Sequence, residues 1–72
     1  MKIRAKNGEQ TVDITLPATD MDIQYCMKCI GIEDIVPVCC ISEVWDEPSY
    51  FGFLKGQTVS MDELNFFARR LD

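Results

Sequence analysis

The chain has 72 residues, of which 47% are hydrophobic and 26% are charged, with twelve acids, seven lysines and arginines, and no histidine. This length allows one domain at most, and the hydrophobic content is that of a folded chain rather than a disordered one. The absence of histidine excludes the most common general base and the Ser–His and Cys–His nucleophile pairs, so we expect no enzyme.

The acidic charge is concentrated in the middle of the chain. Residues 7–63 contain eleven acids but only two basic residues, Lys28 and Lys55, which gives a net charge of −9 over this stretch. Such a field repels nucleic acid and attracts cationic surfaces. The sequence therefore predicts no direct nucleic-acid binding and favours a protein partner, although acidity also serves solubility alone.

The first two predicted elements are the strands of a β-hairpin. Apolar and polar residues alternate over residues 1–6 and again over residues 11–16, which is the two-residue period of half-buried strands. Between them, Asn7-Gly8 suits the positive φ angles of a two-residue type I′ turn.

A helix is predicted after Pro17, which ends the second strand. Thr19 fits the N-cap, and Asp20 and Asp22 fall in the first turn, where carboxylates stabilise a helix. Gly31 fits the position just beyond the helix. The apolar stripe consists of four residues at helical spacing, Ile23, Cys26, Met27 and Ile30.

Two further strands are expected in the second half of the chain. Residues 35–44 are rich in β-branched residues and cysteine, which predicts a central and largely buried strand with Pro37 near its start. Residues 45–49 are predicted to form the connecting loop, and residues 50–54 the fourth strand.

The last predicted element is a helix that begins after Ser60. Ser60 and Glu63 fit a capping box, and Val59 and Leu64 fit the hydrophobic staple around it. Its apolar stripe consists of five residues, Met61, Leu64, Phe67, Ala68 and Leu71. The sequence therefore predicts one α+β domain over residues 1–72, with a small antiparallel sheet of three to four strands, two helices and the order ββαββα.

Four cysteines form the obvious candidate for a zinc site. Cys26 and Cys29 form a CxxC pair, and Cys39 and Cys40 are adjacent. Adjacent strand residues point to opposite faces, so Cys39 and Cys40 cannot both reach one ion without a distorted backbone. A reactive CxxC pair opens a helix, whereas this one lies in the second half of one. We therefore expect no metal and no cofactor, with Cys26 and one of the adjacent pair packed in the core.

No stretch approaches the ~20 apolar residues that a membrane span requires. No apolar stretch follows the basic N-terminal residues, as it does in a signal peptide. These features predict a cytoplasmic protein with reduced thiols and no contact with a membrane.

Aromatic residues outside the predicted stripes are candidates either for core filling or for interface anchors. Phe66 lies off the stripe of the last helix, and Trp45, Tyr50 and Phe51 lie close together in the chain. Aromatic residues fill small cores and also dominate the energetics of interfaces, so both alternatives stay open.

Three segments resemble the antirestriction proteins of the ArdA type. They are Leu-Pro-Ala-Thr at residues 16–19, a helix from residue 24 that closes in Ile-Gly at residues 30–31, and Ser-Met-Asp-Glu-Leu-Asn at the start of residues 60–71. Together they span most of the chain from Leu16 onward. The resemblance implies one module of an elongated, dimeric, several-domain protein that is carried on mobile elements.

The resemblance also implies a DNA mimic, whose spaced carboxylates imitate duplex phosphates and occupy the DNA groove of type I restriction-modification enzymes. The candidate partner-binding acids would then fall into two clusters: Asp20, Asp22, Glu33 and Asp34 around the first helix, and Asp46, Glu47, Asp62 and Glu63 before and within the second. The alternative is a non-catalytic protein-interaction module of a mobile element, which would rely on an apolar patch instead of clustered acids.

Overall fold

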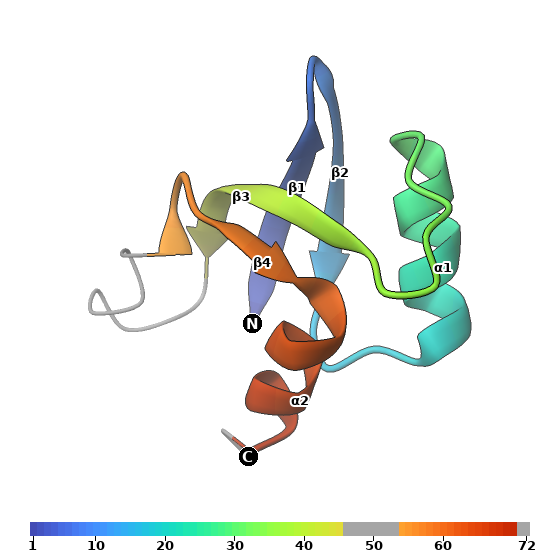
Figure 1. Cartoon of the computed structure of the whole chain (residues 1–72). Helices are drawn as coiled ribbons and strands as arrows, with labels where there is room; N and C mark the ends of the chain where they lie inside the picture. The colour runs from blue at the N-terminus through green and yellow to red at the C-terminus, as the bar shows by residue number, and fades with distance from the viewer. Residues whose placement is uncertain (46–53, 71–72) are drawn as a thin grey trace.

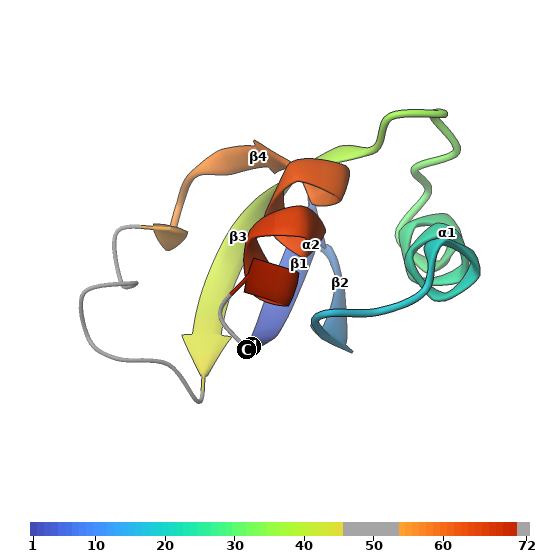
Figure 2. The ribbon, with the colours of Figure 1, turned by 90° about the horizontal axis from the view of Figure 1, so that it is seen from below.

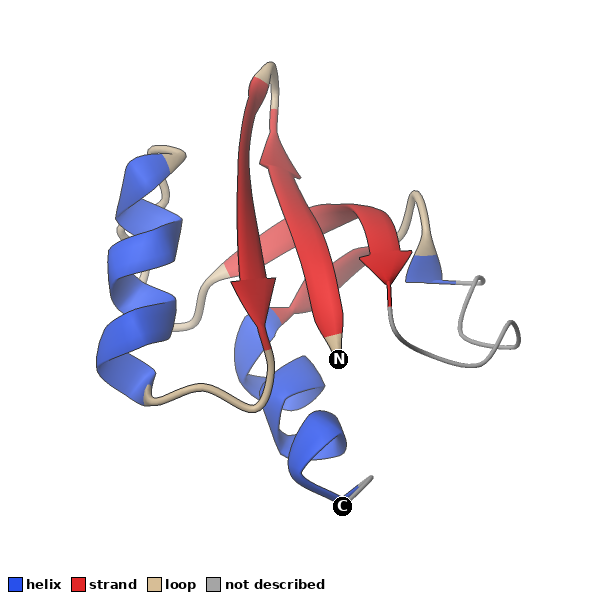
Figure 3. Ribbon diagram, turned by 180° about the vertical axis from the view of Figure 1, so that it is seen from behind, coloured by secondary structure: helices blue, strands red, loops and turns tan. Residues whose placement is uncertain are grey.

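The computed structural model of the chain describes residues 1–45 and 54–70. The elements are β1 (Lys2–Asn7), β2 (Gln10–Thr15), α1 (Asp20–Cys29), β3 (Val38–Trp45), β4 (Thr58–Ser60) and α2 (Met61–Arg70) (Figure 1). The strands form one antiparallel sheet in the order β2-β1-β3-β4, which confirms the predicted α+β class and the order ββαββα. In Figures 1 and 3, α1 lies beside β2, and α2 lies at the end of the sheet near the N-terminus.

The N-terminal hairpin is confirmed, but its turn lies one residue later than predicted. Asn7 pairs with Gln10, so Gly8 and Glu9 form the two-residue loop. Gly8 has a φ of +64°, a conformation that glycine adopts without steric cost. Asn7 is therefore the last residue of β1, and its side-chain amide donates a hydrogen bond to the carbonyl oxygen of Ile30, 2.7 Å away.

The register of the hairpin follows from the apolar residues of both strands. Ala5 lies opposite Val12, and Ile3 lies opposite Ile14. A loop made of residues 7 and 8 would instead place Ala5 opposite Gln10. Because the observed register puts apolar residues opposite one another on the core side, burial favours it over the register that the turn signal predicted.

Both ends of α1 are confirmed. The side-chain oxygen of Thr19 accepts a hydrogen bond of 3.1 Å from the backbone N–H of Asp22, which makes Thr19 the N-cap. Gly31 follows the helix with a φ of +81°, as expected of a residue that ends a helix. Ile23 and Met27 of the predicted stripe are buried, so this stripe faces the core.

The third strand is shorter than predicted, since β3 begins at Val38 instead of Ile35. Ile35 and Val36, 93% and 57% exposed, lie in the segment before the strand. Pro37 has no N–H to give to a strand pair, and its carbonyl oxygen instead accepts a hydrogen bond of 2.9 Å from the backbone of Met61. β-Branched residues at 35 and 36 thus mark an exposed connection and not a buried strand.

The fourth strand of the described sheet lies later in the chain than the range predicted for a fourth strand. β4 comprises Thr58–Ser60 and pairs with the start of β3, with Ser60 opposite Val38. Residues 50–53 of the predicted strand lie outside the described residues, and Leu54 is buried in a turn. Three residues are too few to show an alternating pattern, so the pairing with β3 decides this strand, not its own sequence.

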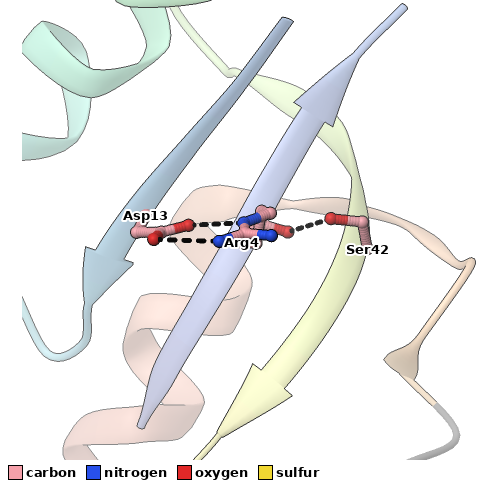
Figure 4. A network of polar contacts seen from close by, with 3 residues as sticks. All are labelled: Arg4, Asp13 and Ser42. Atoms are coloured by element: carbon pink, nitrogen blue, oxygen red, sulfur yellow. Dashed lines mark hydrogen bonds and ion pairs between the residues drawn. The ribbon is translucent and has the colours of Figure 1, made fainter. Parts of the chain in front are cut away.

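A β-bulge shifts the pairing of β3 with β1. Arg4 lies opposite Glu43 and Ala5 opposite Ile41, which leaves Ser42 as the extra residue. The hydroxyl of Ser42 donates a hydrogen bond of 3.3 Å to the carbonyl oxygen of Arg4 (Figure 4). The extra residue reverses the alternation along β3, so Val44 packs against the core although it lies three positions after Ile41.

One hydrophobic core collects side chains from all of the larger elements. Its buried residues include Ile3, Ala5, Ile14, Ile23, Met27, Cys39, Ile41, Met61, Leu64 and Ala68. The buried residues of β1 alternate with its basic ones, so one side of the sheet faces this core and the other carries Lys2, Arg4 and Lys6. Seen from below in Figure 2, α1 lies beside β2 and β4 leads directly into α2.

Candidate functional site

The predicted partner-binding acids that the structure describes are all exposed. These six are Asp20, Asp22, Glu33, Asp34, Asp62 and Glu63. Within residues 1–45 and 54–70, none of the six takes part in an ion pair. Asp46 and Glu47, the other two predicted acids, lie outside the described residues. The six carboxylates are consequently open to solvent or to a partner.

The acids of the sheet differ, because they are neutralised within the chain. Arg4 contacts Asp13 through two hydrogen bonds, of 2.8 and 3.3 Å (Figure 4), and Lys55 lies 3.4 Å from Glu43. The hydrogen bond from Arg4 lowers the pKa of the Asp13 carboxyl below its ordinary value. Both acids of the sheet thus have a cationic partner, while the exposed acids around the helices have none among the described residues.

A groove lies between the two helices and the segment that leads into β3. Its volume is about 300 Å³. We call it the interhelical groove; its lining residues are Asp20, Ile23, Gln24, Ile35, Pro37, Asp62, Asn65, Phe66 and Arg69. The groove brings together Asp20 of α1 and Asp62 of α2, which the sequence had placed in separate clusters.

A second hollow adjoins the interhelical groove. It has a volume of about 190 Å³, is lined by Glu33 and Asp34 among others, and shares Gln24, Ile35 and Pro37 with the groove. Because the shared residues join the two hollows, Glu33 and Asp34 belong to the same surface as Asp20 and Asp62. Four of the six described acids therefore gather on one side of the molecule.

The remaining two acids do not join this surface. Asp22 lines neither hollow, and Glu63 lines a different one on α2 together with Leu54 and Phe67. Residues two positions apart on a helix point to different sides, which separates Asp22 from Asp20. The two predicted clusters are thus regrouped by the fold into one acidic surface, with Asp22 and Glu63 apart from it.

Asn65 holds the two sides of the groove together, and its role was missed from the sequence. This side chain is 4% exposed. Its Nδ2 donates to the carbonyl oxygen of Ala18 at 3.0 Å, and its Oδ1 accepts from the N–H of Ala18 at 2.9 Å. Arg69 donates to the same carbonyl oxygen at 3.3 Å. A polar residue next to the apolar stripe of a helix was the signal that could have indicated this role.

Apolar side chains also line the groove and remain exposed. Ile35 is 93% exposed and Phe66 is 61% exposed. The guanidinium carbon of Arg70 lies 5.5 Å from the centroid of the Phe66 ring, which covers one part of that ring. The groove therefore presents both apolar surface and carboxylates to an incoming molecule.

The ring of Trp45 is in contact with basic side chains of the same chain. Arg4 and Lys2 lie 5.0 and 5.4 Å from its ring centroid, on the outward side of the sheet, and the tryptophan is only partly exposed. Tyr50 and Phe51 lie outside the described residues. Of the aromatic residues that the sequence singled out, Phe66 is consequently the one that the structure places beside the predicted acids.

Two of the four cysteines pack in the core, while Cys29 is exposed and Cys40 half-buried. Cys39 is buried in the core and Cys26 packs against it in part, as predicted. Burial raises the pKa of the Cys39 thiol to about 11, and burial also raises that of Cys26. Both thiols are thus protonated and weakly nucleophilic at neutral pH. Among the described residues, no three His, Cys, Asp or Glu side chains gather in a way that could hold a metal ion.

Within the described part of the chain, no helix has the length and apolar character needed to cross a membrane. Comparison of the chain with known protein families, curated proteins and solved structures gives no match.

Proposed function

We propose that this chain is a non-catalytic acidic domain that inhibits type I restriction-modification enzymes by occupying their DNA-binding groove. The observation that carries the proposal is the distribution of paired and unpaired carboxylates. The sheet acids Asp13 and Glu43 have cationic partners, whereas the six exposed acids of the helices and the segment between them have none within the described residues. This unbalanced negative charge is available to a basic surface.

The physical basis is electrostatic attraction to a site built for a polyanion. Duplex DNA carries one negative charge per ~1.7 Å of its axis, and DNA-binding grooves are correspondingly basic. The longest dimension of the chain is 30 Å, the length of about nine base pairs. One such domain therefore corresponds to part of a DNA footprint, in keeping with a module of a longer mimic.

The resemblance to ArdA-type proteins supplies the target class, and a contact joins two of the segments that carry it. Asn65 belongs to the segment 60–71 and Ala18 to the segment 16–19, two of the three segments that carry the resemblance. The two residues are joined by reciprocal hydrogen bonds across 47 positions of sequence. The resembling segments thus form one structural unit that positions Asp20 and Asp62.

Binding to a purified type I restriction-modification complex tests the proposal. We expect affinity to fall at least about tenfold between ~50 and ~200 mM salt, because charge supplies most of the attraction. Duplex DNA that contains the recognition site should compete for the same site, and the chain should protect DNA from cleavage. Binding that resists both salt and excess DNA would remove the proposal.

A second candidate function is a general protein-interaction module, and the exposed Ile35 and Phe66 favour it. For such a module, we expect salt to change the affinity for the partner only slightly and substitution of apolar residues to lower it strongly. Binding of variants to the same complex separates the two functions. If the chain is an interaction module, Ile35→Ser combined with Phe66→Ser should reduce affinity more than neutralisation of Asp20 and Asp62.

A further inference from the structure

The interhelical groove has an apolar lining. Two buried residues, Ile23 and Pro37, and two exposed ones, Ile35 and Phe66, supply it. Single exposed apolar residues are common on protein surfaces, whereas apolar side chains that line a hollow together with a few polar groups form a candidate binding site. A volume of about 300 Å³ is at the lower limit of ligand pockets and suits a few side chains of a partner.

The rim of the groove is negative. Asp20 and Asp62 line the groove, and Glu33 and Asp34 line the hollow that adjoins it. Two basic residues face the same surface: Lys28 lines the second hollow, and Arg69 lines the groove and donates a hydrogen bond to a backbone carbonyl. Four acids against two basic residues leave a net charge of −2 on this surface.

The combination of apolar lining and negative rim restricts the occupant. Nucleic acid and acidic peptides are repelled by the rim. A second copy of the chain carries a net charge of −5 and is repelled as well. A simple cation or a polyamine satisfies the carboxylates but leaves Ile35 and Phe66 exposed to water. A protein segment that carries basic and apolar side chains satisfies both.

We infer that the interhelical groove binds a segment of another protein in which an apolar side chain is flanked by lysine or arginine. The inference rests on the proposed function, because Asp20 and Asp62 belong to the acidic surface that would face the basic groove of the target. It adds an apolar anchor to that contact: one side chain of the partner enters between Ile35 and Phe66 while its basic neighbours reach the carboxylates.

Synthetic peptides test the inference without a restriction enzyme. The full chain, labelled with ¹⁵N, is titrated with acetyl-Lys-Leu-Lys-amide, acetyl-Lys-Ser-Lys-amide and acetyl-Glu-Leu-Glu-amide while backbone amide shifts are recorded. We expect the Lys-Leu-Lys peptide to shift amides of residues 20–24, 35–36 and 62–69, with an affinity at least about threefold above that of the other two. Equal shifts from the Lys-Ser-Lys peptide, or shifts centred elsewhere, would overturn the inference.

A pair of variants provides the matched control. Ile35→Ser combined with Phe66→Ser removes the apolar lining from two exposed positions, whereas Met21→Ser alters a residue that is 80% exposed and lies outside the groove. The double variant should lose the difference between the Lys-Leu-Lys and Lys-Ser-Lys peptides, and Met21→Ser should keep it. Concentration-dependent shifts of the groove amides without peptide would instead identify a second copy as the occupant and overturn the inference.

The same variants separate this inference from the proposed function. If the restriction-modification complex binds the chain with the expected salt dependence but does not distinguish Ile35→Ser/Phe66→Ser from Met21→Ser, and no peptide prefers the groove, the inference fails and the proposed function stands. If the peptide binds as expected but the complex does not bind, the proposed function fails.

Discussion

The outward side of the sheet and the surface around the interhelical groove use similar side chains in different ways. On the sheet, Arg4 binds Asp13 and lies against the ring of Trp45, so cation, carboxylate and aromatic ring satisfy one another. Around the groove, Asp20 and Asp62 have no ionic partner among the described residues, and the rings and alkyl groups beside them stay exposed.

This difference shows on which side of the molecule carboxylates are available to bind a partner. A paired carboxylate on a strand contributes to the local fold, and a partner would have to displace its cation before binding it. An unpaired carboxylate in the first turn of a helix already interacts with the helix dipole, and it still has acceptor capacity left for a partner. The groove is therefore the side of the molecule on which substitutions should affect binding most.

Of the substitutions considered, removal of the Asn65 side chain should lower the free energy of unfolding most. Asn65→Ala leaves the N–H of Ala18 without its partner, removes one of the two hydrogen bonds to the Ala18 carbonyl oxygen, and should lower the free energy of unfolding by about 1–3 kcal/mol. Urea denaturation measures the loss. Asn7→Ala is the matched control, because the exposed Asn7 makes one hydrogen bond and its loss should cost about 0.5–1.5 kcal/mol. Equal losses in the two variants would mean that Asn65 does not hold the groove.

Neutralising the acids of the groove should weaken partner binding. Asp20→Asn combined with Asp62→Asn should reduce affinity for the restriction-modification complex about tenfold, or ~1.4 kcal/mol, and should act mainly on the association rate. Glu9→Lys changes the net charge by the same two units at the tip of the hairpin, away from the groove, and should change affinity less than about threefold. Similar losses in both would show that net charge matters and the position of the acids does not.

The helix caps that place these acids should contribute to stability. The hydroxyl of Ser60 accepts a hydrogen bond of 3.4 Å from the N–H of Glu63, so Ser60→Ala should cost about 0.5–2 kcal/mol, near the lower end because this bond is long. Thr19→Ala removes the corresponding 3.1 Å bond of α1 and should cost at least as much. Denaturation midpoints of the two variants give the comparison; an unchanged midpoint for Ser60→Ala would show that α2 does not need this cap.

The pair on the sheet should show the smallest effect and a defined dependence on pH. Because Arg4 lowers the pKa of Asp13, the carboxylate favours folding above the ordinary carboxyl pKa of 3.8, and this contribution is lost as pH falls below that value. Asp13→Asn should therefore be slightly less stable than the parent chain at pH 7, and the difference should shrink as pH falls below 3.8. A difference that persists at low pH would assign the effect to packing instead of charge.

Much of the local structure follows from the sequence. The alternation over residues 1–6 and 11–16 predicts the hairpin, and Thr19, Ser60 and Gly31 predict the ends of the helices, as the structure confirms. Periodicity and capping depend on residues within about four positions of one another, so the sequence contains the information directly. The exposure of the six described acids belongs here too, since charged residues seldom lie buried without a partner.

Other features were decided only by contacts between distant parts of the chain. The sequence placed strands at residues 35–44 and 50–54, whereas the pairing of Ser60 with Val38 sets both the start of β3 and the position of β4. In the same way, Asp20 and Asp62 line one groove, and the hydrogen bonds between Asn65 and Ala18, 47 positions apart, join the two segments that carry them. Strand pairing and the groove both join residues far apart in the sequence, and no local pattern specifies which distant segments come together. Burial in the common core, which contains residues of the sheet and of both helices, determines that choice.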